Sequence, residues 1–295
     1  MLEWLRSLRV SREAVIVLFA TITSILSLLL SIPTSTPLSP YNTGDHGYSH
    51  LLTLHTLTVT MSLPKDDKNI IIILPLERRI DERSVKSIRN LLMHGSTIVV
   101  LDEKGYSNQL LEDVGVKAKV VSVTVLDEVS KAYSRFYPVA SLRLGNNTLR
   151  IVTFKPSYIF IDNISRAATV ARTSQYAYAD VNNDGYYNVG EPIESFIIAS
   201  LWKVGNGSLW LVSDIDIFRN DLIDLGDNGK LLEMLVDSKP SYLVIDYLNI
   251  SSIDILKYWF SQLPVHIGID SALPALICYG LLLGIYCVMK YAEKR

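Results

Sequence analysis

The longest apolar stretches of the chain lie at its two ends. Residues 14–32 and 271–289 carry no charged side chain, and each is close to the length of about 20 apolar residues that a transmembrane helix needs. Neither stretch shows the polar stripe expected of a helix that packs on a soluble core. The pattern therefore predicts two transmembrane helices that flank a single domain.

Basic residues beside these stretches predict how the chain is oriented. Residues 1–13 hold three arginines and residues 290–295 hold three Lys or Arg, whereas residues 33–64 hold none. Because the cytoplasmic flanks of membrane helices collect Lys and Arg, we expect a cell membrane protein with both terminal tails in the cytoplasm and the domain outside. A cleaved signal peptide is the alternative for the first stretch, although no A-x-A-like site follows it.

Strand and helix patterns alternate at the start of the domain. Ile70–Leu74 is a continuous apolar run typical of a strand buried on both faces. Asp81 then suits a helix N-cap, and apolar residues recur at helical spacing through residues 82–93. A strand at 97–101 and a helix near 107–114 repeat this unit. The alternation predicts a parallel sheet with right-handed crossovers.

The middle of the domain follows a different pattern. Residues 117–204 contain short β segments separated by turn residues, which we interpret as a β-rich insertion. Strand and helix patterns resume after it and end in an amphipathic helix near 252–262. We expect an α/β fold: a parallel-sheet domain over residues 46–262 that carries this insertion, follows a Pro/Ser/Thr-rich linker at 33–45, and is flanked by two transmembrane helices.

Composition excludes several kinds of chemistry in the domain. Cys278 and Cys287 both lie in the second apolar stretch, so the domain has no cysteine for a disulfide or a nucleophile. The formal net charge is -2 and the sequence shows no basic stripe, so we expect no nucleic-acid partner.

Two short motifs bear on the surroundings of the domain. Gly280 and Gly284 give the second apolar stretch a small-residue face on which another membrane protein could pack closely. Four N-x-[ST] acceptors predict a glycosylated outer surface. They are Asn146, Asn163, Asn206 and Asn249.

The sharpest chemical motif is a calcium loop over residues 180–191, which reads D-x-N-x-D-G-x5-E. Ca²⁺ takes about six to eight oxygen ligands, and this spacing turns alternate side chains inward. Because the flanking segments look like strands and not like EF-hand helices, we expect a structural clip with a Kd of about 10⁻⁴ to 10⁻³ M. A plain Asn/Asp/Gly turn is the alternative. The predicted calcium ligands are Asp180, Asn182, Asp184, the carbonyl of Tyr186, Asn188 and Glu191.

A second group of acids follows the apolar runs. Asp102, Asp214 and Asp246 each end a predicted strand. In open α/β sheets ligands bind beyond the carboxyl ends of parallel strands, so these acids could line a crevice together with Glu77 and Arg78. The alternative is that they cap the loops and helices that follow.

Other catalytic patterns are weak or missing. His46, His50 and His55 could hold a metal, but the glutamate of an H-E-x-x-H pair is absent. The sequence contains no G-x-S-x-G elbow, Walker loop or G-x-G-x-x-G. We therefore expect surface histidines and no catalytic residues.

Three segments carry a resemblance to a known family. They are Tyr41–Ser49, Leu91–Asp102, and the stretch from Gly207–Asp214 through Phe218–Asn220 to Asp227 and Asn228. In these segments the chain resembles archaeal, membrane-anchored proteins whose domain of unknown function is related to class I glutamine amidotransferases. The resemblance extends over residues 41–250 and implies a flavodoxin/amidotransferase-like fold. Catalytic amidotransferases place a cysteine at a strand-to-helix elbow, which this domain lacks, so amidotransferase activity is not implied.

Two functions of different class are compatible with these patterns. The first is a non-catalytic, membrane-anchored recognition or scaffolding module outside the cell with a structural calcium site. The second is a divergent extracytoplasmic hydrolase that uses a metal at the strand-end crevice. Converging carboxylates would favour the hydrolase, whereas carboxylates that cap loops would favour the module.

Overall fold

A computed structural model shows how the chain folds. It divides into two compact units, residues 35–250 and the two terminal segments 1–34 with 251–295, and the sites discussed below belong to the first unit. The structure describes residues 17, 20–22, 24, 25, 28, 30–54, 57–64, 69–144, 147–162, 167–236 and 239–267.

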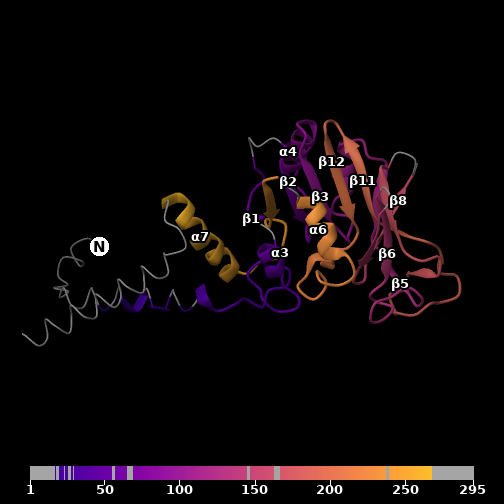
Figure 1. Cartoon of the computed structure of the whole chain (residues 1–295), viewed down its shortest axis with the longest axis horizontal. Coiled ribbons are helices and arrows are strands. Elements are labelled where there is room, and N and C mark those ends of the chain that lie inside the picture. The colour runs from indigo at the N-terminus through magenta and orange to yellow at the C-terminus, as the bar shows by residue number, and fades with distance from the viewer. Residues whose placement is uncertain are drawn as a thin grey trace, which may run out of the picture. The chain divides into compact units, whose positions relative to one another are not determined.

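A mixed β-sheet forms the centre of the 35–250 unit (Figure 1). In the described residues it has nine strands. Neighbouring strands are parallel from β1 to β12, and antiparallel from β12 to β7. In spatial order the strands are β1 (Leu57–Thr60), β13 (Ser241–Val244), β2 (Ile71–Pro75), β3 (Thr97–Leu101), β12 (Gly207–Val212), β11 (Ile197–Val204), β9 (Thr169–Arg172), β6 (Val139–Leu144) and β7 (Asn147–Val152).

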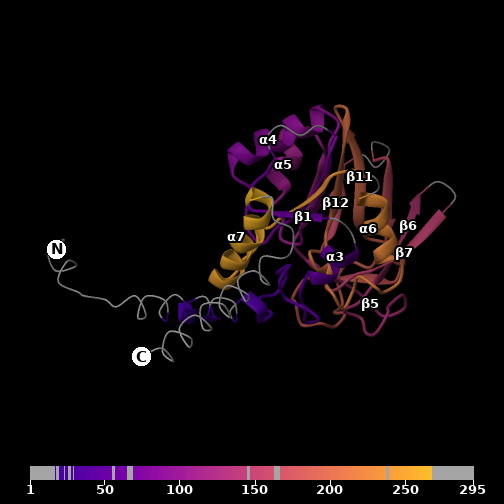
Figure 2. The ribbon, with the colours of Figure 1, turned by 60° about the vertical axis from the view of Figure 1, so that its left-hand side comes forward.

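Helices cover both faces of the parallel half. Helix α4 (Glu82–Met93) and helix α5 (Asn108–Asp113) pack on the face that carries Ile72, Ile98 and Leu211. Helix α6 (Asn228–Val236) lies over the other face, near Ile71 and Trp210, because alternate residues of a strand point to opposite sides. Figure 2 shows α4 and α5 apart from α6. With both faces covered, β2 is buried along its whole length.

Local sequence explains the start of α4. Asp81 has the extended backbone of an N-cap, and its carboxylate accepts hydrogen bonds from the N–H groups of Arg83 at 3.0 Å and Ser84 at 3.1 Å. The helix ends before Gly95, which adopts a positive φ of 95°. The prediction of a helix over residues 82–93 is confirmed.

Smaller elements surround the main sheet. Strand β4 (Ala118–Val121) pairs with β8 (Tyr158–Ile161), and β5 (Thr124–Asp127) pairs with β10 (Ala177–Asp180); both pairs are antiparallel. Three helices also belong to the described chain. They are helix α3 (Ser49–Leu54), the short 3-10 helix η2 (Asp216–Phe218) and helix α7 (Ser252–Ile267).

The predicted parallel sheet is wrong for half of the fold. Strands β11 and β12 are joined by Gly205 and Asn206 alone, and a connection this short permits only antiparallel pairing. Residues 117–204 therefore do more than form an insertion, since they contribute β6, β7, β9 and β11 to the main sheet. The fold class is a mixed, sheet-rich α/β fold.

The predicted flanking transmembrane helices also need correction. Across the described residues, the structure contains no helix with both the length and the apolar character to cross a membrane. Segment 14–32 is described only in part, and segment 271–289 lies outside the described residues. Helix α7 has 16 residues and includes Asp254 and Lys257, whereas a crossing needs about 20 mainly apolar residues.

Candidate functional site

The loop 180–191 begins where strand β10 ends and curls around its own first acid. The side chain of Asp180 is buried, and its two carboxylate oxygens accept the N–H groups of Asp184 at 3.1 Å and Gly185 at 2.9 Å. Asn183 and Gly185 make this turn possible with positive φ values of 62° and 82°. Asp180 therefore organises the first half of the loop.

Glu191 closes the second half of the loop in the same way. Its Oε1 accepts the N–H of Val181 at 2.8 Å, and its Oε2 accepts the N–H of Asn188 at 2.8 Å. The carboxylate thus ties the beginning of the loop to its end. A two-oxygen acid at the twelfth position is what a calcium loop requires.

Asp184 lies between Asp180 and Glu191 in the sequence and accepts hydrogen bonds from both asparagine side chains. Its Oδ2 accepts the Nδ2 groups of Asn182 at 3.1 Å and Asn188 at 2.8 Å, and its Oδ1 accepts the N–H of Tyr186 at 2.8 Å. The hydrogen bond from Asn188, followed by that from Tyr186, lowers the pKa of Asp184. Because an amide can rotate to exchange its nitrogen for its oxygen, both asparagines can present an oxygen to a cation.

A neighbouring segment holds the loop in place. The Nη1 of Arg135 donates to the carbonyl of Gly185 at 3.1 Å, and the guanidinium lies 4.4 Å from the ring centre of Tyr186. Glu128 pairs with Arg135 at 3.1 Å. A Cβ on Gly185 would lie 3.1 Å from the ring of Phe136, so the loop fits closely against residues 128–136.

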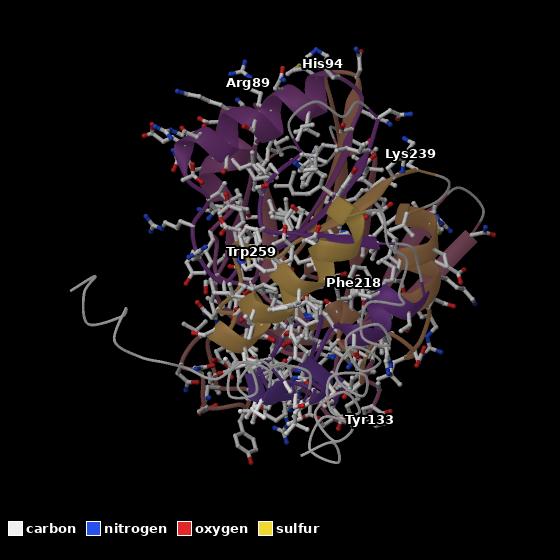
Figure 3. All side chains as sticks on the ribbon, turned by 90° about the vertical axis from the view of Figure 1, so that its left-hand side faces the viewer. Arg89, His94, Tyr133, Phe218, Lys239 and Trp259 are labelled. Carbon is white, nitrogen blue, oxygen red and sulfur yellow. The ribbon has the colours of Figure 1, made fainter. Side chains whose placement is uncertain are left out.

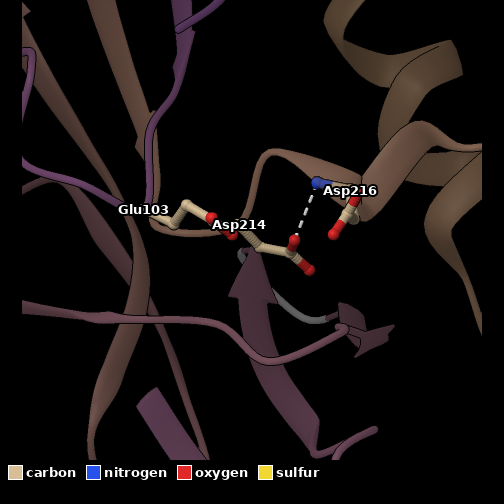
Figure 4. Close-up of side chains that lie close together, drawn as sticks. All are labelled: Glu103, Asp214 and Asp216. Atoms are coloured by element: carbon tan, nitrogen blue, oxygen red, sulfur yellow. Dashed lines mark hydrogen bonds between the residues drawn. The ribbon is translucent and has the colours of Figure 1, made fainter. Parts of the chain in front are cut away.

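A second acidic cluster lies at the carboxyl ends of β3 and β12. Oxygens of Glu103, Asp214 and Asp216 lie within 4.8 Å of one another, and within the described chain this is the one group of three potential metal ligands that are so close (Figure 4). The acids of the loop 180–191 do not meet that distance. The two acidic sites therefore differ in how tightly their carboxylates converge.

Asp214 is the buried centre of this cluster. Its Oδ1 accepts the N–H of Asp216 at 2.8 Å and its Oδ2 accepts the N–H of Phe154 at 2.9 Å. Burial, and then the charge of Asp216, raise the pKa of Asp214 well above its ordinary value. Both of its oxygens accept backbone N–H groups, so Asp214 ties the residue after β12 to Phe154 and to Asp216.

Arg219 offsets the charge of the cluster. Its Nη1 lies 3.3 Å from Asp216, and its Nη2 lies 2.6 Å from Asp221. Burial raises the pKa of Asp216 to about 6, although the charge of Arg219 opposes this shift. The guanidinium of Arg219 thus already neutralises part of the negative charge of the cluster.

The structure does not assemble the predicted crevice. Asp102 accepts the N–H groups of Lys104, Gly105 and Ser107, so it caps its own loop. Asp246 forms an exposed ion pair with Arg78 at 3.2 Å. The Oε2 of Glu77 accepts the N–H of Asn249 at 2.6 Å.

Only Asp214 of the predicted crevice acids lies in the observed cluster. The sequence did not predict its partners Glu103 and Asp216, which follow the strand-end acids Asp102 and Asp214 by one and two residues. The spacing of Asp214 and Asp216 was the available signal. The position of Glu103 depends on β3 and β12 being neighbours in the sheet.

Other predicted sites fall on exposed or undescribed residues. His46 and His50 are exposed, and Asn206 and Asn249 are exposed acceptors for glycosylation. The remaining predicted residues lie outside the described residues: His55, Asn146, Asn163, Gly280 and Gly284, as well as both cysteines.

The structure joins two of the segments that carry the sequence resemblance. The Nδ2 of Asn220 donates to the carbonyl of Gly44 at 2.6 Å and to the Oγ of Ser49 at 3.1 Å. Gly47 is required here, since a Cβ would lie 1.9 Å from the carbonyl oxygen of Asn42. The segment Tyr41–Ser49 thus packs beside Phe218–Asn220, next to the acidic cluster.

Two solved structures show a distant similarity to this chain. The structure "mmIFT52 N-terminal domain" is 18% identical with a TM-score of 0.44, covering 57% of this chain and 77% of that chain. A β-galactosidase from Bacillus circulans sp. alkalophilus is 12% identical with a TM-score of 0.31, covering 67% of this chain and 22% of that chain. No curated protein matches the sequence.

A family model matches the chain over residues 47–236, which is more than half of its length. The family is described as a domain of unknown function (DUF4350). The matched range contains the calcium-type loop and the whole acidic cluster. The chain belongs to the DUF4350 family.

Proposed function

We propose that this protein is a non-catalytic recognition or scaffolding module in which the loop 180–191 holds a structural calcium ion. The observation that carries the proposal is the folding of the loop, in which Asp180 and Glu191 each bind two backbone N–H groups of the loop itself. This arrangement brings every predicted calcium ligand into one curled segment.

The donor set fits calcium better than other common ions. Three carboxylates, two amide oxygens and the Tyr186 carbonyl are all oxygen donors, which is the ligand type that Ca²⁺ selects. Binding would draw the carboxylates closer together than they now lie. A site with only three carboxylates is expected to bind Ca²⁺ weakly, with a Kd of about 10⁻⁴ to 10⁻³ M.

This affinity also motivates our proposal for location. Calcium modules that bind in this range work outside the cytoplasm. Asn206 and Asn249 are exposed, as glycan acceptors must be. We propose an extracytoplasmic domain, an archaeal source, and a fold related to the class I glutamine amidotransferases without their activity.

Calcium removal tests the proposal. At a hundredfold excess of Ca²⁺ over the Kd, binding stabilises the folded state by about 2.7 kcal/mol. For a domain of this size that corresponds to a rise in Tm of roughly 5–10 °C, which a chelator should reverse. Asp184→Ala should abolish the rise, whereas Asp224→Ala, an exposed acid outside both sites, should retain it. A Tm independent of calcium in the wild-type protein would refute the proposal.

The acidic cluster supports a second candidate function. Three carboxylates from the ends of neighbouring parallel strands are the arrangement expected of a metal-dependent hydrolase. Arg219, which already pairs with Asp216, favours a structural role instead. Titration with Mn²⁺ decides between them: saturable binding that Asp216→Asn removes would support the hydrolase.

A further inference from the structure

Helix α4 carries a row of basic side chains on its solvent side. Arg83, Lys86 and Arg89 recur every three residues and are exposed, and the exposed Arg79 precedes the helix. We call these four residues the basic stripe. Figure 3 shows Arg89 and the adjacent His94 on the outer side of α4, away from the sheet. These four residues are a local exception to the lack of a basic stripe in the sequence, and the expectation of no nucleic-acid partner stays a prediction.

The stripe is a local excess of positive charge. Residues 78–94 hold five Lys or Arg and two Asp or Glu, whereas the whole chain holds 28 and 30. Within the part of the chain that the structure describes, no member of the stripe forms an ion pair. These cations are available to an external anion.

The shape and composition of α4 indicate the kind of partner. Met93 is the one large apolar side chain exposed on the helix, and protein interfaces need more apolar or aromatic anchors than this. The outer face of α4 also has no aromatic ring on which nucleobases could stack. Evenly spaced cations on a convex helix suit a broad anionic surface.

We propose that the basic stripe docks this domain onto a membrane surface of anionic lipids. Exposed Lys and Arg side chains near such a surface each strengthen binding about fivefold, or by about 1 kcal/mol, and three of the stripe's four cations lie on α4. A cavity of about 260 Å³ lies beside the stripe, but its lining includes Asp246 as well as Arg83, so the proposal rests on the exposed cations and not on this cavity. The proposal is independent of calcium binding and requires no membrane-spanning segment.

Vesicle co-sedimentation of the full chain tests this docking. The measured quantity is the preference for vesicles of phosphatidylglycerol and phosphatidylcholine over vesicles of phosphatidylcholine alone, so any contribution of apolar segments cancels. We expect a clear preference that weakens as salt rises, because salt screens exposed charges. The triple variant Arg83→Glu, Lys86→Glu, Arg89→Glu should reduce it at least about tenfold.

A matched variant separates the stripe from total charge. Lys117→Glu, Lys203→Glu and Lys239→Glu together change the net charge equally but lie outside α4, and they should keep the preference. Circular dichroism of both variants checks that they fold. Equal binding of the wild-type chain to both vesicle types would overturn the proposal. So would an unchanged preference in the α4 variant, or binding to soluble polyphosphate with no binding to vesicles.

Discussion

The loop 180–191 and the strand-end cluster both combine a buried aspartate with more accessible acids, but they differ in what balances the charge. In the loop, Asp184 is exposed, and the neighbouring acids hold a segment that remains open to solvent. In the cluster, Asp214 is fully buried and Asp216 already has Arg219 as a partner. Within the described residues, the loop keeps Asp184 exposed and without a cationic partner, whereas the cluster encloses Asp214 and already pairs Asp216 with Arg219.

The largest expected loss of stability comes from removing Asp214, the buried acid of the cluster. Asp214→Ala removes a buried acceptor and leaves the half-buried N–H groups of Phe154 and Asp216 without it. Each such loss costs about 1–3 kcal/mol, so we expect the free energy of unfolding to fall by about 2–5 kcal/mol in urea titrations. Asp224→Ala should change it by less than about 0.5 kcal/mol. A loss below about 1 kcal/mol for Asp214→Ala would contradict a structural role.

Glu191→Gln tests the calcium site in the loop 180–191. The amide can still accept one backbone hydrogen bond, but it cannot give Ca²⁺ two charged oxygens. We expect nearly unchanged stability in chelator, together with loss of most of the calcium-dependent stabilisation of about 2.7 kcal/mol. Thermal unfolding with and without Ca²⁺ measures both quantities. A variant that is equally destabilised in both conditions would show that the loop is an ordinary turn.

Asp216→Asn tests how the charge of the acidic cluster affects stability at different pH values. The folded-state pKa of Asp216, about 6, lies above the unfolded value, so the folded state binds more protons between about pH 4 and pH 6. The contribution of Asp216 to stability is therefore greatest below pH 4 and is lost as pH rises to 6. We expect the variant to gain stability relative to wild type on going from pH 4 to pH 7, by about 1–2 kcal/mol. Urea unfolding at both pH values tests this; a relative loss would contradict it.

Asp81→Ala provides the smallest effect and a reference for an exposed acid. Asp81 accepts two backbone N–H groups, as Asp214 does, but at the surface. Hydrogen bonds, led by those of Ser84, lower its pKa to about 2, so its stabilisation is present above pH 4 and is lost as pH falls toward 2. Loss of the N-cap should cost about 1 kcal/mol at neutral pH. If Asp81→Ala lowered the free energy of unfolding as much as Asp214→Ala does, burial would not explain the role of Asp214.

The sequence predicted features that depend on neighbouring residues well, and features that depend on contacts between distant strands poorly. The helix 82–93 and its cap follow from spacing within a dozen residues, and the curled loop 180–191 follows from one continuous motif. The grouping of Glu103 with Asp214 and Asp216 depends on which strands become neighbours. The change from parallel to antiparallel pairing between β12 and β11 follows from a two-residue connection at Gly205 and Asn206. Apolar length alone also predicted transmembrane helices that the described residues do not contain.

Calorimetric titration of the wild-type protein and of Asp184→Ala with Ca²⁺ tests the central claim most directly. We predict one site in the wild-type protein with a Kd of about 10⁻⁴ to 10⁻³ M, and no measurable binding in the variant. No binding to the wild-type protein, or equal binding to both proteins, would contradict a calcium site in the loop 180–191.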